Sequence, residues 1–233
     1  MTAARQKCYS HLQSQIPLWF KLLYSAFVAV VVPYYWLTYT PWNFLYFCDV
    51  ALLMTLVGMW AESSLLISIS TVGIVIAQII WVIDWFCNLL LGVQLTGMTN
   101  YMFNAKIPLY VRGMSSFHGW LPFVLLWLVW KVGYDRRAFR LQTILAIGLL
   151  LVCFFIGPKP PPSAEHPNWA VNINYVWGMD DSASQTIMPP ILWLLLMMTF
   201  LVVVLYLPTH WFLRRFFPAV EARVEIGDSR RKS

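Results

Sequence analysis

The sequence predicts an all-α protein, a polytopic bundle of six transmembrane helices with both termini in the cytoplasm. Three observations predict this fold class. The 233 residues are 60% hydrophobic and only 11% charged, a composition that leaves too little polar surface for a soluble globular domain. Apolar stretches of roughly 20 residues, the length that crosses a bilayer core, occur six times. In this arrangement thirteen of the sixteen lysines and arginines lie on one side of the membrane.

Charged residues or prolines separate the six predicted spans. The first span has no small-residue cleavage site and leads into another span, which indicates a retained anchor rather than a signal peptide. The third is long enough to tilt, whereas the fourth and fifth are short and are expected to extend into their flanks. The runs lack the alternation of barrel strands. The expected spans are residues 18–37, 42–61, 65–91, 116–132, 141–156 and 191–213.

The connections between the spans divide unevenly between the two sides. Residues 1–213 are expected to form one six-helix domain, and residues 214–233 a basic cytoplasmic tail. The non-cytoplasmic side holds the two long connections, residues 92–113 and the proline-rich segment 157–190. Because long loops in a compact protein commonly carry function, this side is the expected working face.

Composition and spacing also exclude several classes of function. The net charge of +6 comes from terminal and loop residues rather than from a basic face, so no nucleic-acid partner is expected. The four cysteines form no Cys-x-x-Cys pair and the four histidines are scattered, so neither a disulfide framework nor a metal site is predicted. We expect no cofactor. Membrane lipids are the expected partners, with a protein partner in a membrane complex as the alternative.

Ionisable residues inside a span are costly and are therefore candidates for a functional site. Asp49 lies within the second predicted span, and Asp84 lies near the outer end of the third. Trp81, Asp84, Trp85 and Asn88 share one helical face. This stripe is either an interfacial aromatic belt or the wall of a pocket that binds a substrate.

Two further residues open predicted spans. His118 lies in the first turn of the fourth span, where the helix dipole favours a neutral imidazole that can accept a proton. Thr40 precedes Pro41, the pattern of a helix N-cap followed by proline. A hydroxyl there also suits a nucleophile, with Asn43 as an oxyanion donor. The simpler interpretations are an interfacial histidine bonded to a loop carbonyl and a plain helix cap. Ser115, three residues before His118, is a minor alternative nucleophile.

Two short segments resemble a known family. Residues 40–44 (Thr-Pro-Trp-Asn-Phe) and 118–123 (His-Gly-Trp-Leu-Pro-Phe) resemble motifs of the androgen-induced and androgen-dependent TFPI-regulating proteins. The resemblance implies a six-span hydrolase that cleaves lipid esters with a threonine and a histidine, here Thr40 and His118. Residues 45–49 (Leu-Tyr-Phe-Cys-Asp) are similar to a stretch in related bacterial integral membrane proteins and an acyltransferase, which makes Cys48 the second candidate nucleophile.

Three functions therefore compete. The first is a lipid-ester hydrolase or acyltransferase, in which Asp49 or Asp84 orients the imidazole of His118, and Arg112 and Lys106 hold a headgroup. The second is a non-catalytic membrane protein, either a structural or accessory subunit or a lipid-binding protein. The third, a transporter, is least favoured because the spans show no inverted repeat and no paired broken helices.

Overall fold

The computed structural model describes residues 16–220, which form helices and loops without a β-strand. Residues 221–233 of the predicted tail lie outside the described residues. Elements η1 and η2 are short 3₁₀ helices, and η3 is a π-helical stretch. The elements are α2 (Leu18–Tyr39), η1 (Pro41–Leu45), α3 (Phe47–Trp60), α4 (Ser64–Leu91), α5 (Asn100–Phe103), α6 (Leu109–Ser115), α7 (Phe117–Val132), α8 (Ala138–Phe155), η2 (Ile173–Tyr175), α9 (Pro190–Phe200), η3 (Leu201–Tyr206) and α10 (Leu207–Phe216).

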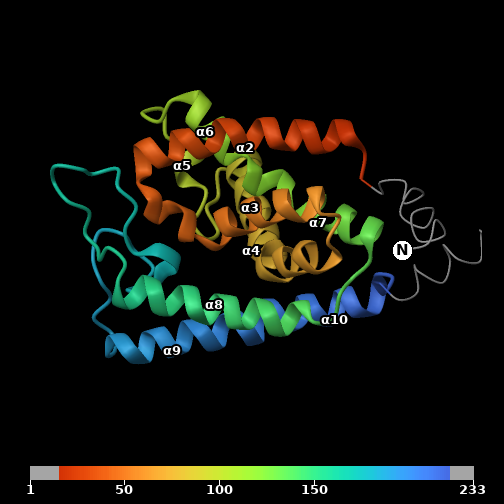
Figure 1. Cartoon of the computed structure of the whole chain (residues 1–233). Helices are drawn as coiled ribbons and strands as arrows, with labels where there is room; N and C mark the ends of the chain where they lie inside the picture. Colours follow the sequence, from red (N-terminus) through yellow and green to blue (C-terminus); the bar gives the residue numbers. More distant parts are fainter. Residues whose placement is uncertain (1–15, 221–233) are drawn as a thin grey trace, which may run out of the picture.

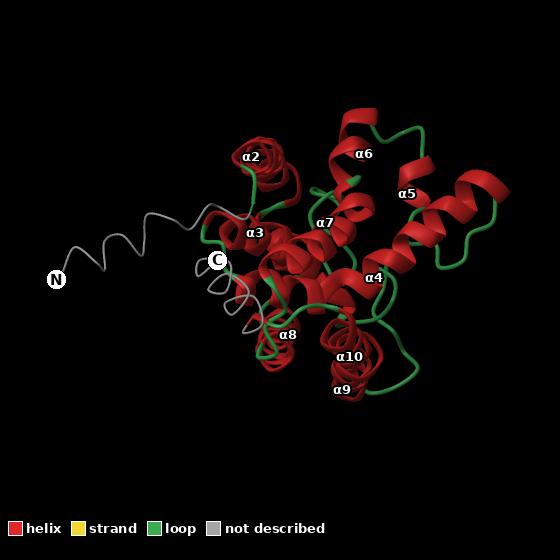
Figure 2. Cartoon of the chain, turned by 90° about the vertical axis from the view of Figure 1, so that its right-hand side faces the viewer, coloured by secondary structure: helices red, strands yellow, loops and turns green. Residues whose placement is uncertain are grey.

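Helix α4 lies at the centre of the molecule. Helices α2, α8 and the continuous α9–η3–α10 segment have similar axes, the last running antiparallel to the other two, with α2 on one side and α8 and α9–η3–α10 together on the opposite side (Figure 1). Figure 2 shows α4 lengthwise where these helices are seen end-on, so α4 crosses them steeply. The buried half of α4 carries small and polar residues such as Ser68, Thr71 and Gly73, which allow its neighbours to approach closely.

Four helical segments are long and apolar enough to cross a membrane. They are α2, α4, α8 and the combined segment Pro190–Phe216. Each corresponds to a predicted span, which supports the prediction of an integral membrane protein. The predicted number of six spans and the orientation of the termini are not confirmed.

The other two predicted spans are short helices: α7 begins and ends within one residue of the predicted span 116–132, whereas α3 is shorter than the predicted span 42–61. Helix α3 has 14 residues and α7 has 16, or about 21 and 24 Å at 1.5 Å per residue, against a bilayer core of about 30 Å. The second span was predicted to begin at residue 42, but Tyr46 has extended backbone angles and separates η1 from α3. The expected loop 92–113 also contains the short helices α5 and α6.

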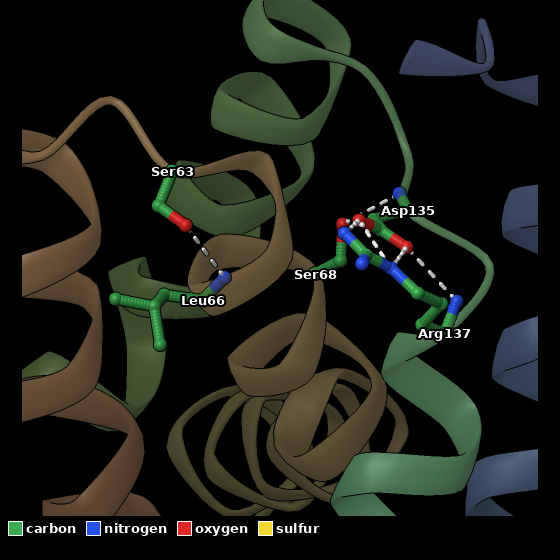
Figure 3. A network of polar contacts seen from close by, with 5 residues as sticks. All are labelled: Ser63, Leu66, Ser68, Asp135 and Arg137. Carbon is green, nitrogen blue, oxygen red and sulfur yellow. Dashed lines mark hydrogen bonds and ion pairs between the residues drawn. The ribbon is translucent and has the colours of Figure 1, made fainter. Parts of the chain in front are cut away.

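Polar contacts fix the end of the molecule where α4 begins (Figure 3). The hydroxyl of Ser63 accepts a hydrogen bond from the Leu66 amide and caps α4. In the turn between α7 and α8, the Asp135 amide donates to Ser68 Oγ at 3.0 Å, and Arg137 Nη2 lies 2.7 Å from Asp135 Oδ2. The hydrogen bond from Arg137 lowers the pKa of the Asp135 carboxyl. Short turns join α3 to α4 and α7 to α8.

Candidate functional site

The polypeptide between α2 and α3 bends sharply at Thr40. Thr40 has a φ of 73°, unusual for a β-branched residue, and Pro41 opens η1 directly after it. The predicted N-cap position with proline at the first helical position is therefore confirmed. The predicted capping bond is absent, since Thr40 Oγ1 is buried and has no hydrogen-bond partner in the structure. Thr40 consequently makes no hydrogen bond to His118.

Asn43 and Asp49 form a buried polar pair across the break at Tyr46. Asn43 Nδ2 donates to Asp49 Oδ2 at 3.0 Å. The other carboxylate oxygen, Asp49 Oδ1, is buried and has no hydrogen-bond partner in the structure. The amide of Asn43, predicted to stabilise an oxyanion, is thus directed at a carboxylate instead.

The proline-rich segment closes over this break through Asn174. Asn174 Oδ1 accepts from the Phe47 amide at 3.0 Å, and its Nδ2 donates to the Leu45 carbonyl at 2.8 Å. These bonds satisfy backbone groups on both sides of Tyr46. Asn174 and Tyr175 both have positive φ, of 58° and 59°. A left-handed tyrosine is strained by about 1–3 kcal/mol, so the surrounding contacts determine its position.

Cys48 lies near several hydroxyl-bearing side chains. The Cys48 thiol is half-buried and interacts electrostatically with four tyrosines and with Asp49. Tyr35 Oη lies 3.4 Å from Ser115 Oγ, and the Tyr101 side chain also contacts Ser115. We call this group the tyrosine–cysteine cluster; its members are Tyr35, Tyr46, Cys48, Asp49, Tyr101, Ser115 and Tyr175.

The cluster combines segments that lie far apart in the sequence. Its members come from α2, the start of α3, α5, the end of α6 and η2. Burial raises the pKa of the Tyr101 and Tyr175 phenols, so both hydroxyls stay protonated at neutral pH and can donate hydrogen bonds. The cluster therefore offers a thiol, a carboxyl group and several hydroxyl groups in one place.

His118 lies beside the cluster rather than inside it. Its Nδ1 is 2.8 Å from the Ser115 carbonyl oxygen, and its ring stacks on Trp81 with centroids 5.6 Å apart. The Trp81 side chain also contacts Tyr101. A backbone carbonyl, rather than Asp49 or Asp84, therefore orients the imidazole. This carbonyl makes Nδ1 the protonated nitrogen and leaves Nε2 as a proton acceptor.

His118 does lie in the first turn of α7, as predicted, but this turn is not a free helix start. Only Ser116 separates α6 from α7, and the Gly119 amide donates to the Ser116 carbonyl. The Ser116 hydroxyl donates to the Gly113 carbonyl instead of capping α7. The preceding helix thus weakens the dipole effect expected at His118.

Asp84 holds a loop in place and is not directed at His118. Its two carboxylate oxygens accept hydrogen bonds from the backbone amides of Leu95, Thr96 and Thr99 and from the Thr99 hydroxyl, at 2.6–3.1 Å. Both carboxylate oxygens of Asp84 therefore accept hydrogen bonds from a loop in the described part of the chain. This geometry corrects the orienting role predicted for Asp84 and indicates a structural anchor.

The remaining predicted binding residues behave differently from one another. Trp81 contacts the cluster, whereas Trp85 packs edge-on against Phe86. Asn88 Nδ2 is buried without a hydrogen-bond partner. Arg112 Nη1 donates to the Met102 carbonyl at 3.0 Å, which joins α6 to α5 and leaves the guanidinium less suited to the predicted headgroup contact.

Comparisons with known proteins add no assignment. No family model, curated protein or solved structure matches this chain. Within residues 16–220, no group of three or more His, Cys, Asp or Glu side chains could hold a metal ion.

Sequence reasoning missed Tyr35 and Tyr101 as site residues. Both lie in segments without a recognisable motif, and only the fold brings them to Cys48. The asparagines at 172 and 174 are the one local signal for Tyr175, because asparagine tolerates the left-handed conformation that this loop adopts.

Proposed function

We propose that this protein is an integral membrane enzyme that hydrolyses or transfers the acyl group of a lipid ester, with Cys48 as nucleophile. The observation that supports this proposal is the place of Cys48, a half-buried cysteine near the tyrosines of the tyrosine–cysteine cluster. Thr40, the first candidate from the sequence, has no hydrogen-bonded base to activate it. The hydroxyl-bearing side chains near Cys48 support the second candidate instead.

His118 supplies the base in this proposal. Nδ1 is held by the Ser115 carbonyl, so Nε2 is the nitrogen that can take a proton. Ser115 and Trp81 connect His118 with the cluster, because each contacts both His118 and Tyr101. Nε2 takes the proton of the Cys48 thiol. The protonated imidazole then acts as the acid in the next step.

The acyl chemistry then balances in two steps. The Cys48 thiolate attacks the ester carbonyl, a C–S bond forms, the C–O bond breaks, and His118 returns its proton to the departing alkoxide. Water or an acceptor alcohol then gives a proton to His118 and attacks the thioester carbonyl; the C–S bond breaks, the Cys48 thiolate takes the proton back from His118, and the acid or a new ester is released. The phenol hydroxyls of Tyr35 and Tyr101 are the candidate donors to the oxyanion.

The proposal includes a membrane orientation. Helices α3 and α7 complete six membrane segments, with both termini in the cytoplasm and the cluster on the opposite side. The basic residues Lys131, Arg136 and Arg137 support this orientation, because they lie at the end of the molecule away from the cluster, where cytoplasmic loops carry lysine and arginine.

Fatty-acid release from long-chain acyl esters by the purified protein in nanodiscs tests the proposal. Wild type is expected to release fatty acid, and His118→Ala is expected to lower the rate by about 100-fold to 10,000-fold through loss of the base. His210→Ala, which changes a histidine at the other end of the molecule, is the control. A wild-type protein without turnover on any ester would instead favour the non-catalytic membrane protein.

A further inference from the structure

The turn between α7 and α8 packs against α10 near one end of the molecule (Figure 1). The Tyr134 hydroxyl lies 2.6 Å from His210 Nδ1, and the His210 ring packs against the Phe139 ring, with centroids 5.0 Å apart. Arg136 lies between these two aromatic residues in the sequence, at an exposed position. The contacts on either side of Arg136 therefore place its backbone beside α10.

Arg214 approaches the same turn from α10. It lies about one helical turn beyond His210 on the same face of α10, and the Tyr134 amide donates to the Pro218 carbonyl at 2.8 Å. His210 and Pro218, which precede and follow Arg214, thus both contact Tyr134. The His210 side chain also interacts electrostatically with Arg136 and with Arg214. We call Arg136 and Arg214 the arginine pair.

No acidic side chain of the described part of the chain neutralises the arginine pair. The acids at this end of the molecule, Glu62 and Asp135, each form an ion pair with another basic side chain at 2.7 Å. Arg136 and Arg214 are exposed and form no ion pair within the described part of the chain. Residues 221–233 carry three acidic and four basic side chains, so they add no net negative charge. The arginine pair is therefore a surplus of positive charge.

Exposed apolar side chains lie next to the arginine pair on both helices. Leu141 and Ile144 of α8 are 38% and 61% exposed, and Leu207 and Trp211 of α10 are 47% and 66% exposed. Leu207, Trp211 and Arg214 share one face of α10. Both helices belong to segments that are long and apolar enough to cross a membrane, and tryptophan is common at the level of the lipid headgroups. The arginine pair therefore lies where two such segments end, beside a surface that suits acyl chains.

We propose that the arginine pair binds the phosphate of an anionic phospholipid from the surrounding bilayer. A guanidinium group forms paired, charge-assisted hydrogen bonds with phosphate oxygens, and basic groups between membrane helices bind anionic headgroups. The two guanidinium groups hold the phosphate, and the exposed apolar side chains of α8 and α10 contact the acyl chains. The proposal uses no residue of the tyrosine–cysteine cluster and is therefore independent of the proposed ester chemistry.

Native mass spectrometry of the full-length protein in detergent tests the proposal by titration with phosphatidylglycerol and with phosphatidylcholine that carries the same acyl chains. We expect wild type to bind phosphatidylglycerol roughly tenfold more tightly than phosphatidylcholine. Arg136→Gln and Arg214→Gln should each weaken phosphatidylglycerol binding about fivefold, the contribution of one basic residue beside anionic lipid, and change phosphatidylcholine binding little. Lys106→Gln removes an exposed positive charge from the loop between α5 and α6 and is the matched control, expected to bind both lipids as wild type does.

Four results would overturn the proposal. Three are equal affinities of wild type for the two lipids, a loss in Lys106→Gln as large as in the arginine variants, and wild-type affinity in both arginine variants. The fourth is displacement of phosphatidylglycerol by an equimolar amount of inorganic phosphate, which would show a site for a free anion. Both arginines are exposed, so the variants are expected to fold. Arg136→Lys keeps the charge and should bind phosphatidylglycerol more tightly than Arg136→Gln.

Discussion

Cys48→Ala is expected to lower ester turnover to background, a loss of roughly a thousandfold or more, because the proposed mechanism forms the acyl intermediate on Cys48. The substitution removes the sulfur atom of a half-buried residue and leaves the hydrogen bonds of Asn43, Asp49 and Asn174 in place. The protein should therefore still fold. Initial rates of fatty-acid release, normalised to folded protein by gel filtration, provide the measurement.

Two matched variants identify the cause of this loss. Cys87→Ala changes another half-buried cysteine, within α4, and should retain activity. Thr40→Ala removes the hydroxyl that has no hydrogen-bond partner and should also retain substantial activity. If Thr40→Ala abolished turnover while Cys48→Ala did not, the threonine mechanism implied by the family resemblance would replace the one proposed here.

Asp84→Ala is expected to cause the largest loss of stability, about 3 kcal/mol or more locally. The substitution leaves the Leu95, Thr96 and Thr99 amides and the Thr99 hydroxyl without their acceptor, and hydrogen bonds to a charged group contribute about 1.5–3 kcal/mol each. Hydrogen exchange of the backbone amides of residues 95–99 measures the local loss of stability directly. Thermal unfolding in detergent measures whether the whole protein is destabilised.

A series of substitutions at residue 84 separates the loss of hydrogen bonds to the loop from the loss of the Asp84 charge. Asp84→Asn keeps one acceptor oxygen and should lose less stability than Asp84→Ala. Glu165→Ala, at an exposed position, should change exchange at residues 95–99 very little. Exchange in Asp84→Ala that equals the wild-type rate would show that other contacts hold this loop.

The apolar pattern predicted most helices correctly but not where all of them begin. Long apolar runs determine α2, α4, α8 and the α9–α10 segment, because burial away from water favours a helix wherever the run is long enough. The start of α3 at Phe47 depends on Asn174, 127 positions further along the chain. No local window of sequence contains that interaction.

The sequence predicted several residues of the candidate site, but not how their side chains are arranged. Asn43, Asp49, Ser115 and His118 were singled out from the sequence, and the structure joins them as two hydrogen-bonded pairs, Asn43 with Asp49 and Ser115 with His118. The choice between Thr40 and Cys48 depended on which side chain meets other polar groups, a property of tertiary packing. Asp84 was misinterpreted because its partners lie 11–15 residues away in a loop whose path the sequence does not reveal.

Mass spectrometry of the protein after brief incubation with a long-chain acyl ester tests the central claim most directly. The proposed mechanism predicts an added acyl mass on the peptide that contains Cys48, sensitive to hydroxylamine as a thioester is, and accumulating when the second step is slowed at low temperature. An acyl group on Thr40 or Ser115 instead, or no adduct in a protein that turns over the ester, would contradict it.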